Sequence, residues 1–374
     1  MSGLFWQLPG PSLFLERVAQ SFRDGRNVFI IVPEHGPARI RYAIAELVNR
    51  RELHAWHPID ASEDTSDAPT PAEIVARQCI SGVRPCTVKE LSEHEQFRHM
   101  IVWVDGIDPG SWGSWRDFLQ EYSHLCRARP QRERAVFCLP VLGAQIGDLP
   151  AEDVVCAVHV WRGVVTRLDM TLFFSHLLAA RSVTRMHAKL WNAVGVELAG
   201  TDSELAIHLA RADLPSVLAP AHILQEFARG RGWRPWGAEK SPSWSLGDED
   251  VLDGKSILHS ARVILEKDGR DEIERRLWRG QVGTLFPFVE EQRVELIARF
   301  RSFLRVPHET PFGTITDIRD FELGHLLYQV RKRNIDEPTR RLLGTLTDIR
   351  HRLAHLESVP YELLASPELA GRFA

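Results

Sequence analysis

Leu342–Glu357 reads LLGTLTDIRHRLAHLE, and this stretch organises the C-terminal part of the chain. At about 100° per residue in a helix, its apolar positions fall within roughly 40° of one line. These positions are Leu342, Leu346, Ile349, Leu353 and Leu356. His351 and His355 fall together on the opposite side, with Arg350 on their flank. The pattern predicts an amphipathic helix whose apolar stripe packs in a core and whose histidines face solvent.

The R-H-R-L-A-H segment that contains Arg350, His351 and His355 resembles the RNase motif of HEPN domains, which are small helical bundles. In that family an arginine, the polar residue after it and a histidine a few residues later form the catalytic site. The spacing alone is weak evidence, because two other pairs share it: Arg181 with His187, and Arg319 with His325. The context favours the third pair, since its helix follows other long helices and meets a stop at residues 358–360.

These residue types suit metal-independent RNA cleavage, because the 2′-OH of RNA is an internal nucleophile. A histidine can remove that proton or protonate the leaving 5′-oxygen, and an arginine can stabilise the charge that gathers on phosphorus. Arg350 and His355 lie about 140° apart on one helix, so they cannot easily converge within one chain. The resemblance implies a homodimer through the C-terminal bundle, in which each helix lends groups to a shared cleft.

Basic residues flank the loop before this helix, and they are Arg331, Lys332, Arg333, Arg340 and Arg341. One interpretation is that they are solvated helix ends. The other is that they hold the RNA backbone. A net charge of −4 gives no bulk attraction to nucleic acid, so any contact with an RNA substrate must be local.

The first part of the chain alternates helices with apolar runs such as residues 28–32 and 100–104. Strands without period-2 alternation, separated by helices, predict an α/β domain with a parallel sheet covered on both faces. We expect this domain to span residues 1–165. Its order of elements resembles a P-loop NTPase core of the AAA or STAND kind.

The phosphate-binding loop of that class is missing from the chain. Residues 33–39, PEHGPAR, follow the first strand, and they offer one glycine, two prolines, no lysine, and Glu34 where phosphate would sit. Asp105 ends a strand where a magnesium-binding acid would be, and Asp108 follows it. We interpret the domain as degenerate, without nucleotide cofactor or NTPase activity. The alternative is that Arg39 or Arg41 replaces the lysine.

The sequence after residue 165 predicts an all-α region in two parts. Residues 166–254 read as a helical connector that ends in a loop rich in Trp, Pro and Gly. The indoles of Trp233, Trp236 and Trp244 are expected to pack on a neighbouring domain rather than to stack on RNA. Residues 255–374 read as a HEPN-like bundle. Its expected helices cover residues 256–266, 271–282, 286–304, 317–333 and 337–356.

Composition narrows the remaining possibilities. The chain shows no leader pattern and no apolar run long enough to cross a bilayer, which predicts a cytoplasmic protein without membrane contact. Its 5 cysteines show no metal-ligand spacing, so we expect no metal site.

The family resemblance implies a bacterial defence (antiviral) or toxin-like ribonuclease. In it, the N-terminal domain would be a sensor or would dock a protein partner. The alternative function is a non-catalytic scaffold within a multi-protein complex.

Overall fold

The computed structural model describes residues 2–51, 54–62, 69–82, 84, 87–143, 149–237, 242–311, 313–331, 333 and 335–373. The chain forms two compact units. The first, which we call the α/β unit, comprises Met1–Asp169 and Ser241–Ile257. The second, the helical unit, comprises Met170–Lys240 and Leu258–Ala374. The division differs from the predicted boundaries after residues 165 and 254, because the chain returns to the α/β unit after leaving it.

A parallel five-stranded sheet forms the centre of the α/β unit, as the apolar runs predict. Its strands are β1 (Asn27–Val32), β2 (Ala55–Asp60), β3 (Met100–Asp105), β4 (Val136–Leu142) and β5 (Cys156–Val160). Their order is β2-β3-β4-β1-β5, and every residue of β1 is buried. The carboxyl ends of β1, β3 and β4 therefore meet at one edge of the sheet.

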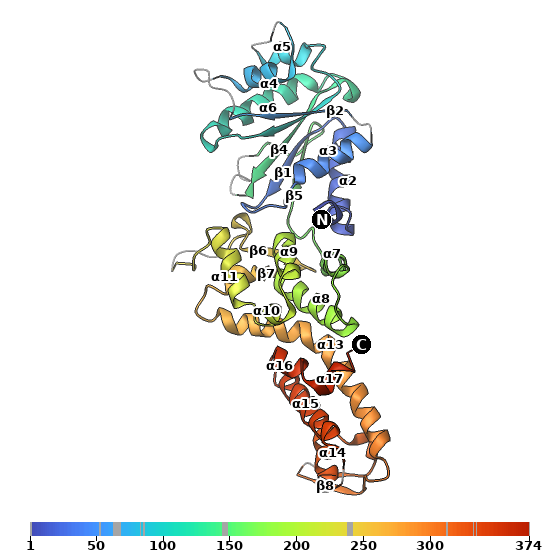
Figure 1. Cartoon of the computed structure of the whole chain (residues 1–374). Coiled ribbons are helices and arrows are strands. Elements are labelled where there is room, and N and C mark those ends of the chain that lie inside the picture. The colour runs from blue at the N-terminus through green and yellow to red at the C-terminus, as the bar shows by residue number, and fades with distance from the viewer. Residues whose placement is uncertain are drawn as a thin grey trace. The chain divides into compact units, whose positions relative to one another are not determined.

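Helices cover both faces of this sheet (Figure 1). One face carries α4 (Pro71–Cys79), α5 (Val88–Glu93) and α6 (Trp112–Cys126), and the other carries α2 (Pro9–Arg23) and α3 (Ile40–Arg50). Short helical segments complete the unit: α1 (Ser2–Phe5), η1 (Pro109–Ser111) and η2 (Gln131–Glu133). The helix α2 begins at Pro9, which supplies the fixed φ that suits a first helical position.

The returning segment contains η4 (Trp244–Leu246) and a hairpin of β6 (Glu249–Leu252) and β7 (Lys255–Leu258). A helix was expected over residues 256–266, but Lys255–Leu258 form β7 and the helix α12 covers only Ser260–Val263. Asp253 and Gly254 both have positive φ, 50° and 78°, as a tight two-residue hairpin turn requires. The Asp-Gly pair was the sequence signal for this hairpin.

The helical unit is built on α13, a helix of 32 residues. The other helices are α7 (Arg167–Leu178, which begins in the α/β unit), α8 (Arg185–Ala199), α9 (Ser203–Arg211), α10 (Leu214–Leu218), α11 (Ala221–Gly230), α12 (Ser260–Val263), α13 (Gly269–Phe300), α14 (Leu323–Val330), α15 (Glu337–Ala354), α16 (Tyr361–Leu364) and α17 (Pro367–Ala370). The remaining elements are β8 (His308–Thr310), β9 (Gly313–Ile315) and η5 (Ile318–Asp320). Among the described residues, no helix has the length and apolar character that crossing a membrane requires.

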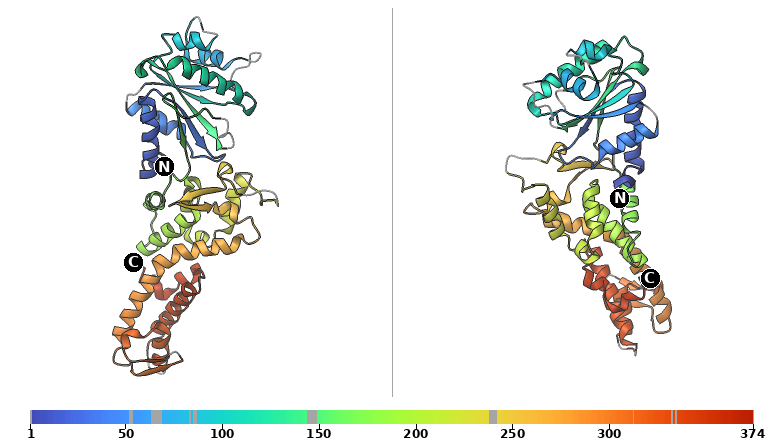
Figure 2. Two further views of the ribbon diagram at one scale, coloured as in Figure 1. Left: turned by 180° about the vertical axis from the view of Figure 1, so that it is seen from behind. Right: turned by 45° about the horizontal axis from the view of Figure 1, so that its top comes forward.

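The single helix α13 replaces the two predicted helices 271–282 and 286–304. Pro287 lies inside it, and Figures 1 and 2 show that the helix bends, as a proline that removes a backbone donor causes. The first half packs on α8 so closely that a Cβ on Gly280 would lie 2.6 Å from the Cα of Val194. The second half runs beside α15 in both figures.

A buried polar group ties α9 to α12 in the helical unit. Asp202 caps α9, and its carboxylate also accepts from Arg231 at 2.6 Å and from Nε2 of His259 at 3.0 Å. The Nδ1 atom of His259 accepts the Ala261 N–H, which caps α12. His259 must therefore be neutral, with its proton on Nε2. Burial lowers the pKa of His259 despite the neighbouring carboxylate.

Because His259 is buried in its neutral form, we expect the folded chain to lose stability in mild acid. The unfolded chain binds a proton at His259 as pH falls below about 6.5, whereas the folded chain resists it, so the free energy of unfolding decreases over that window. His259→Asn should cost about 1–3 kcal/mol at neutral pH and should flatten the decrease between neutral pH and mild acid. Urea unfolding at several pH values measures both. His176→Asn, at an exposed histidine, should leave the dependence of the free energy of unfolding on pH as in the wild type. If His259→Asn also leaves this dependence unchanged, His259 is not the group that resists protonation.

Candidate functional site

The helix α15 presents the predicted stripe to the core of the helical unit. Asp336 caps its first turn by accepting from the Thr339 N–H. The buried positions are at most 3% exposed, and they are Leu342, Leu346, Ile349 and Leu353. These members of the predicted stripe are confirmed.

Leu356 is the exception, because the helix ends before reaching it. His355 is the C-cap residue, and Leu356 follows in the left-handed region with φ 62° and 58% exposure. The Glu357 N–H donates to the Arg352 carbonyl and the Leu356 N–H to the Leu353 carbonyl, which is a Schellman turn. The prediction that Leu356 packs in the core is therefore wrong. His355 lies at a helix end rather than within the helix.

Side chains of α13 hold this turn in place. The indole N–H of Trp278 donates to the Leu353 carbonyl at 2.8 Å. The buried amide of Gln281 pairs with both backbone groups of Val359, and Glu274 accepts the Ser358 N–H. The position of His355 is thus fixed by contacts on both sides of it in the sequence.

His351 and His355 lie side by side, as the wheel predicts. Their ring centroids are 4.3 Å apart and the rings are tilted by 53°. Both side chains are exposed. A ligand that approaches through solvent can therefore reach both imidazoles, and imidazoles can accept or donate protons.

Arg350 points to other partners than these histidines. Its Nε atom lies 3.3 Å from Oε1 of Glu290 on α13, and its Nη1 atom lies 2.6 Å from Oε2 of Glu322 before α14. Within the described part of the chain, no hydrogen bond or ion pair joins Arg350 to His351 or His355. The structure brings the two histidines together and leaves the arginine apart.

The group around Arg350 carries no net charge. Arg293 lies 2.7 Å from the second oxygen of Glu290 and also donates to the backbone carbonyls of Arg319 and Phe321. Two guanidinium groups therefore face two carboxylates. The guanidinium of Arg350 has further N–H groups on Nη2, so it can still donate to a ligand oxygen.

The predicted RNA-binding cations separate into two sets. Arg340 lies 3.9 Å from Glu337, and Arg341 lies 3.7 Å from Glu337 and 2.6 Å from Glu368. Arg331 and Arg333 are exposed and take part in no ion pair among the described residues. Lys332 lies outside the residues that the structure describes. Part of the predicted positive surface is thus neutralised by local carboxylates.

In the α/β unit, the segment after β1 already bonds to another part of the same chain. The Glu34 N–H, which in a phosphate-binding loop would face phosphate, donates to the Ser245 carbonyl at 2.8 Å. Trp244 packs against the core of the unit, and a Cβ on Gly143 after β4 would lie 2.7 Å from its ring. The indoles of this loop were expected to pack on a neighbouring domain, and Trp244 does pack on the core of the predicted domain 1–165. Trp233 and Trp236 instead lie beside Arg231 and Arg262 in the helical unit.

The acids at the same edge of the sheet also have protein partners. Arg41 lies 2.7 Å from Asp105, and this hydrogen bond raises the pKa of Arg41. Asp108 accepts from the Gly110 N–H as the cap of η1. These residues do not fit a magnesium–nucleotide complex, since the carboxylate is paired and the loop N–H is used.

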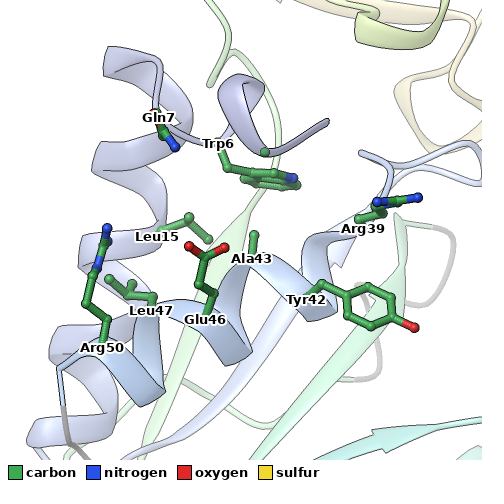
Figure 3. A pocket seen from close by; sticks show the side chains of 10 residues that line it. Trp6, Gln7, Leu15, Arg39, Tyr42, Ala43, Glu46, Leu47 and Arg50 are labelled. Carbon is green, nitrogen blue, oxygen red and sulfur yellow. The ribbon is translucent and has the colours of Figure 1, made fainter. Parts of the chain in front are cut away.

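A hollow of about 160 Å³ lies between α2 and α3 (Figure 3). Figure 3 shows the indole of Trp6 above it and the carboxylate of Glu46 directed toward that ring. Arg39 and Arg50 come from either end of α3. This hollow has room for one side chain of a partner. Nothing in it resembles a catalytic pair.

Within the described ranges, no group of three or more His, Cys, Asp or Glu side chains could hold a metal ion. The described cysteines carry free thiols, and burial raises the pKa of Cys79 to about 12. Thiol chemistry at neutral pH is therefore not favoured at this position.

The occupied loop after β1 predicts weak nucleotide binding. ATP and GTP should bind no more tightly than about 1 mM and should not be hydrolysed, because the Glu34 N–H already donates to the Ser245 carbonyl and Asp105 is paired with Arg41. Titration calorimetry with and without magnesium measures this. Micromolar, magnesium-dependent binding would show that the Trp244 segment moves aside and would contradict the prediction.

No family model matches this chain, and no curated protein matches its sequence. The functional assignment therefore rests on the residues of α15 and their surroundings.

Proposed function

We propose that this chain is a metal-independent RNA endonuclease of HEPN type whose acid–base pair is His351 and His355. The observation that carries the proposal is the pair of exposed imidazoles, 4.3 Å apart, at an anchored helix end. A neutral imidazole accepts the proton of the 2′-OH as the 2′-oxygen attacks phosphorus. A protonated imidazole donates to the departing 5′-oxygen. The products are a 2′,3′-cyclic phosphate and a 5′-hydroxyl.

Arg350 takes the role of stabilising the phosphorane charge in this proposal. Glu290 and Glu322 orient its guanidinium toward α13 and α14, away from the histidines of the same chain. A second chain would have to bring its own histidines to this arginine. The proposed active species is therefore a homodimer, with residues of both chains in each site.

The α/β unit has the role of a sensor or a docking module in this proposal. Its strand order is in keeping with the AAA and STAND cores that the sequence resembles. The Arg41–Asp105 pair and the Trp244 segment argue against nucleotide turnover. The hollow beside Trp6 and Glu46 is the better candidate for contact with a partner.

A non-catalytic scaffold is the second candidate function. The ion pairs of Arg350 favour it, because a neutral group of two arginines and two glutamates does not attract phosphate by itself. Such a chain would use the bundle to bind protein partners, and His351 and His355 would be ordinary surface residues.

Cleavage of mixed RNA in EDTA tests the first candidate. The wild-type chain should produce 2′,3′-cyclic phosphate ends without metal, and His355→Ala should lower the rate by about 10²–10⁴-fold. The melting temperature should stay near that of the wild type, because the exposed side chain contributes about 0.5 kcal/mol or less.

Two variants serve as controls for that assay. His176→Ala, which removes another exposed histidine of the helical unit, should cut RNA at the wild-type rate. Leu353→Ala should instead lose activity by unfolding, since the cavity costs about 2–5 kcal/mol. A His355→Ala chain that melts normally and cuts RNA as fast as the wild type would assign the bundle to the scaffold function.

A further inference from the structure

A second surface of the helical unit combines exposed aromatic and cationic side chains. Tyr328 on α14 is 68% exposed, and its ring centroid lies 5.7 Å from that of His308 on β8. The ring of His308 also contacts Phe321 and His325, so its position is set from behind. The ring of Tyr328 thus faces solvent, tilted by 42° from that of His308, although no core requires an aromatic residue there.

The backbone of Arg305 is tied to Gln329, the residue that follows Tyr328. Its backbone N–H donates to the side-chain oxygen of Gln329, and the amide of Gln329 donates back to the Arg305 carbonyl, both at 2.8 Å. The guanidinium donates to the carbonyls of Ser302 and Leu304 and, among the described residues, to no carboxylate. Its positive charge is therefore not neutralised by an ion pair there, and its backbone is held by Gln329, the neighbour of Tyr328 in the sequence.

Arg331 and Arg333 lie just beyond Tyr328 in the sequence. The Arg331 N–H donates to the Tyr328 carbonyl and the Arg333 N–H to the Val330 carbonyl, which turns the backbone at the end of α14. We call the group of Arg305, His308, Tyr328, Arg331 and Arg333 the Tyr328 surface.

Other arginines of this region differ by having acidic partners. The pairs are Arg299 with Asp336, Arg319 with Asp317, Arg350 with Glu290 and Glu322, and Arg341 with Glu368. In the described part of the chain, the guanidinium groups of the Tyr328 surface make no such pair. Cations that are left unpaired beside an exposed aromatic ring fit a ligand that offers both phosphates and flat faces.

We propose that the Tyr328 surface binds single-stranded RNA, with a base stacked on Tyr328 and phosphates on Arg305, Arg331 and Arg333. A duplex keeps its bases stacked on one another and cannot offer a face to the ring, whereas a single strand can. An acidic protein would satisfy the cations but would leave the exposed ring of Tyr328 unused. The choice of RNA as the polyanion rests on the proposed function.

The test uses the full chain with His355→Ala, so that RNA binding is read without cleavage and without regard to whether the chain is a nuclease. The probe is a fluorescent oligoadenylate, and its competitors are an abasic strand of equal length, an RNA duplex and polyglutamate. Tyr328→Ala should weaken binding of oligoadenylate by roughly 5- to 100-fold, the effect of losing one stacked base. The abasic strand should bind both chains equally, because it has no base to stack.

The cations have a separate expected result. Arg331→Gln and Arg333→Gln should each weaken binding of both strands and lower the salt dependence by about one phosphate contact. Tyr42→Ala, which removes a similarly exposed tyrosine of the α/β unit, and Arg299→Gln, whose side chain is paired with Asp336, should bind as the parent chain does.

Three outcomes would overturn the inference. Tyr328→Ala could bind oligoadenylate as tightly as the parent, the duplex could compete as well as the single strand, or polyglutamate could displace the probe equally well. The last result would assign the surface to an acidic protein partner. If the wild-type chain does not cut RNA but Tyr328→Ala still weakens binding of oligoadenylate, the proposed function is contradicted and the binding surface is supported.

Discussion

The ion pairs of Arg350 with Glu290 and Glu322 are the contacts on which the candidate site depends. They join α15 to α13 and to the start of α14, and the planar guanidinium fixes the direction of each contact. Because the side chains are 27–50% exposed, water screens their attraction, so their main effect is orientation rather than stability. The same pairs neutralise the arginine. A phosphate must therefore be attracted by other cations, and among the described residues the Tyr328 surface offers arginines that form no ion pair.

The bent helix α13 contacts both parts of the candidate site in the helical unit. It supplies Glu290 to Arg350, and it supplies Trp278 and Gln281 to the turn around His355. Its first half is pressed against α8 at Gly280, where a larger residue would meet backbone. One rigid element thus sets the positions of both the arginine and the histidines. It keeps them apart within one chain, which is why the proposed catalysis needs two chains.

Periodicity in the sequence predicted the features that repeat within one element. The stripe of α15, the exposure of His351 and His355 and the buried parallel strands follow from local pattern alone. Leu356 was misplaced because the helix ends in a Schellman turn without the glycine that usually marks it. The partners of Arg350 lie 28 and 60 residues away along the chain (350 − 322 and 350 − 290) and had no local signal. The particular unit on which Trp244 packs also had no local signal, because its position depends on the chain returning to the α/β unit.

Mixing two inactive chains tests the central claim, a composite site, most directly. One chain carries Arg350→Ala and the other His355→Ala, and each alone should fail to cut RNA. If each site takes its arginine from one chain and its histidines from the other, the mixed dimer holds one intact site. An equal mixture that exchanges freely should then recover roughly a quarter of the wild-type rate. A mixture that stays as inactive as its components, although the two chains are shown to associate, would contradict the account.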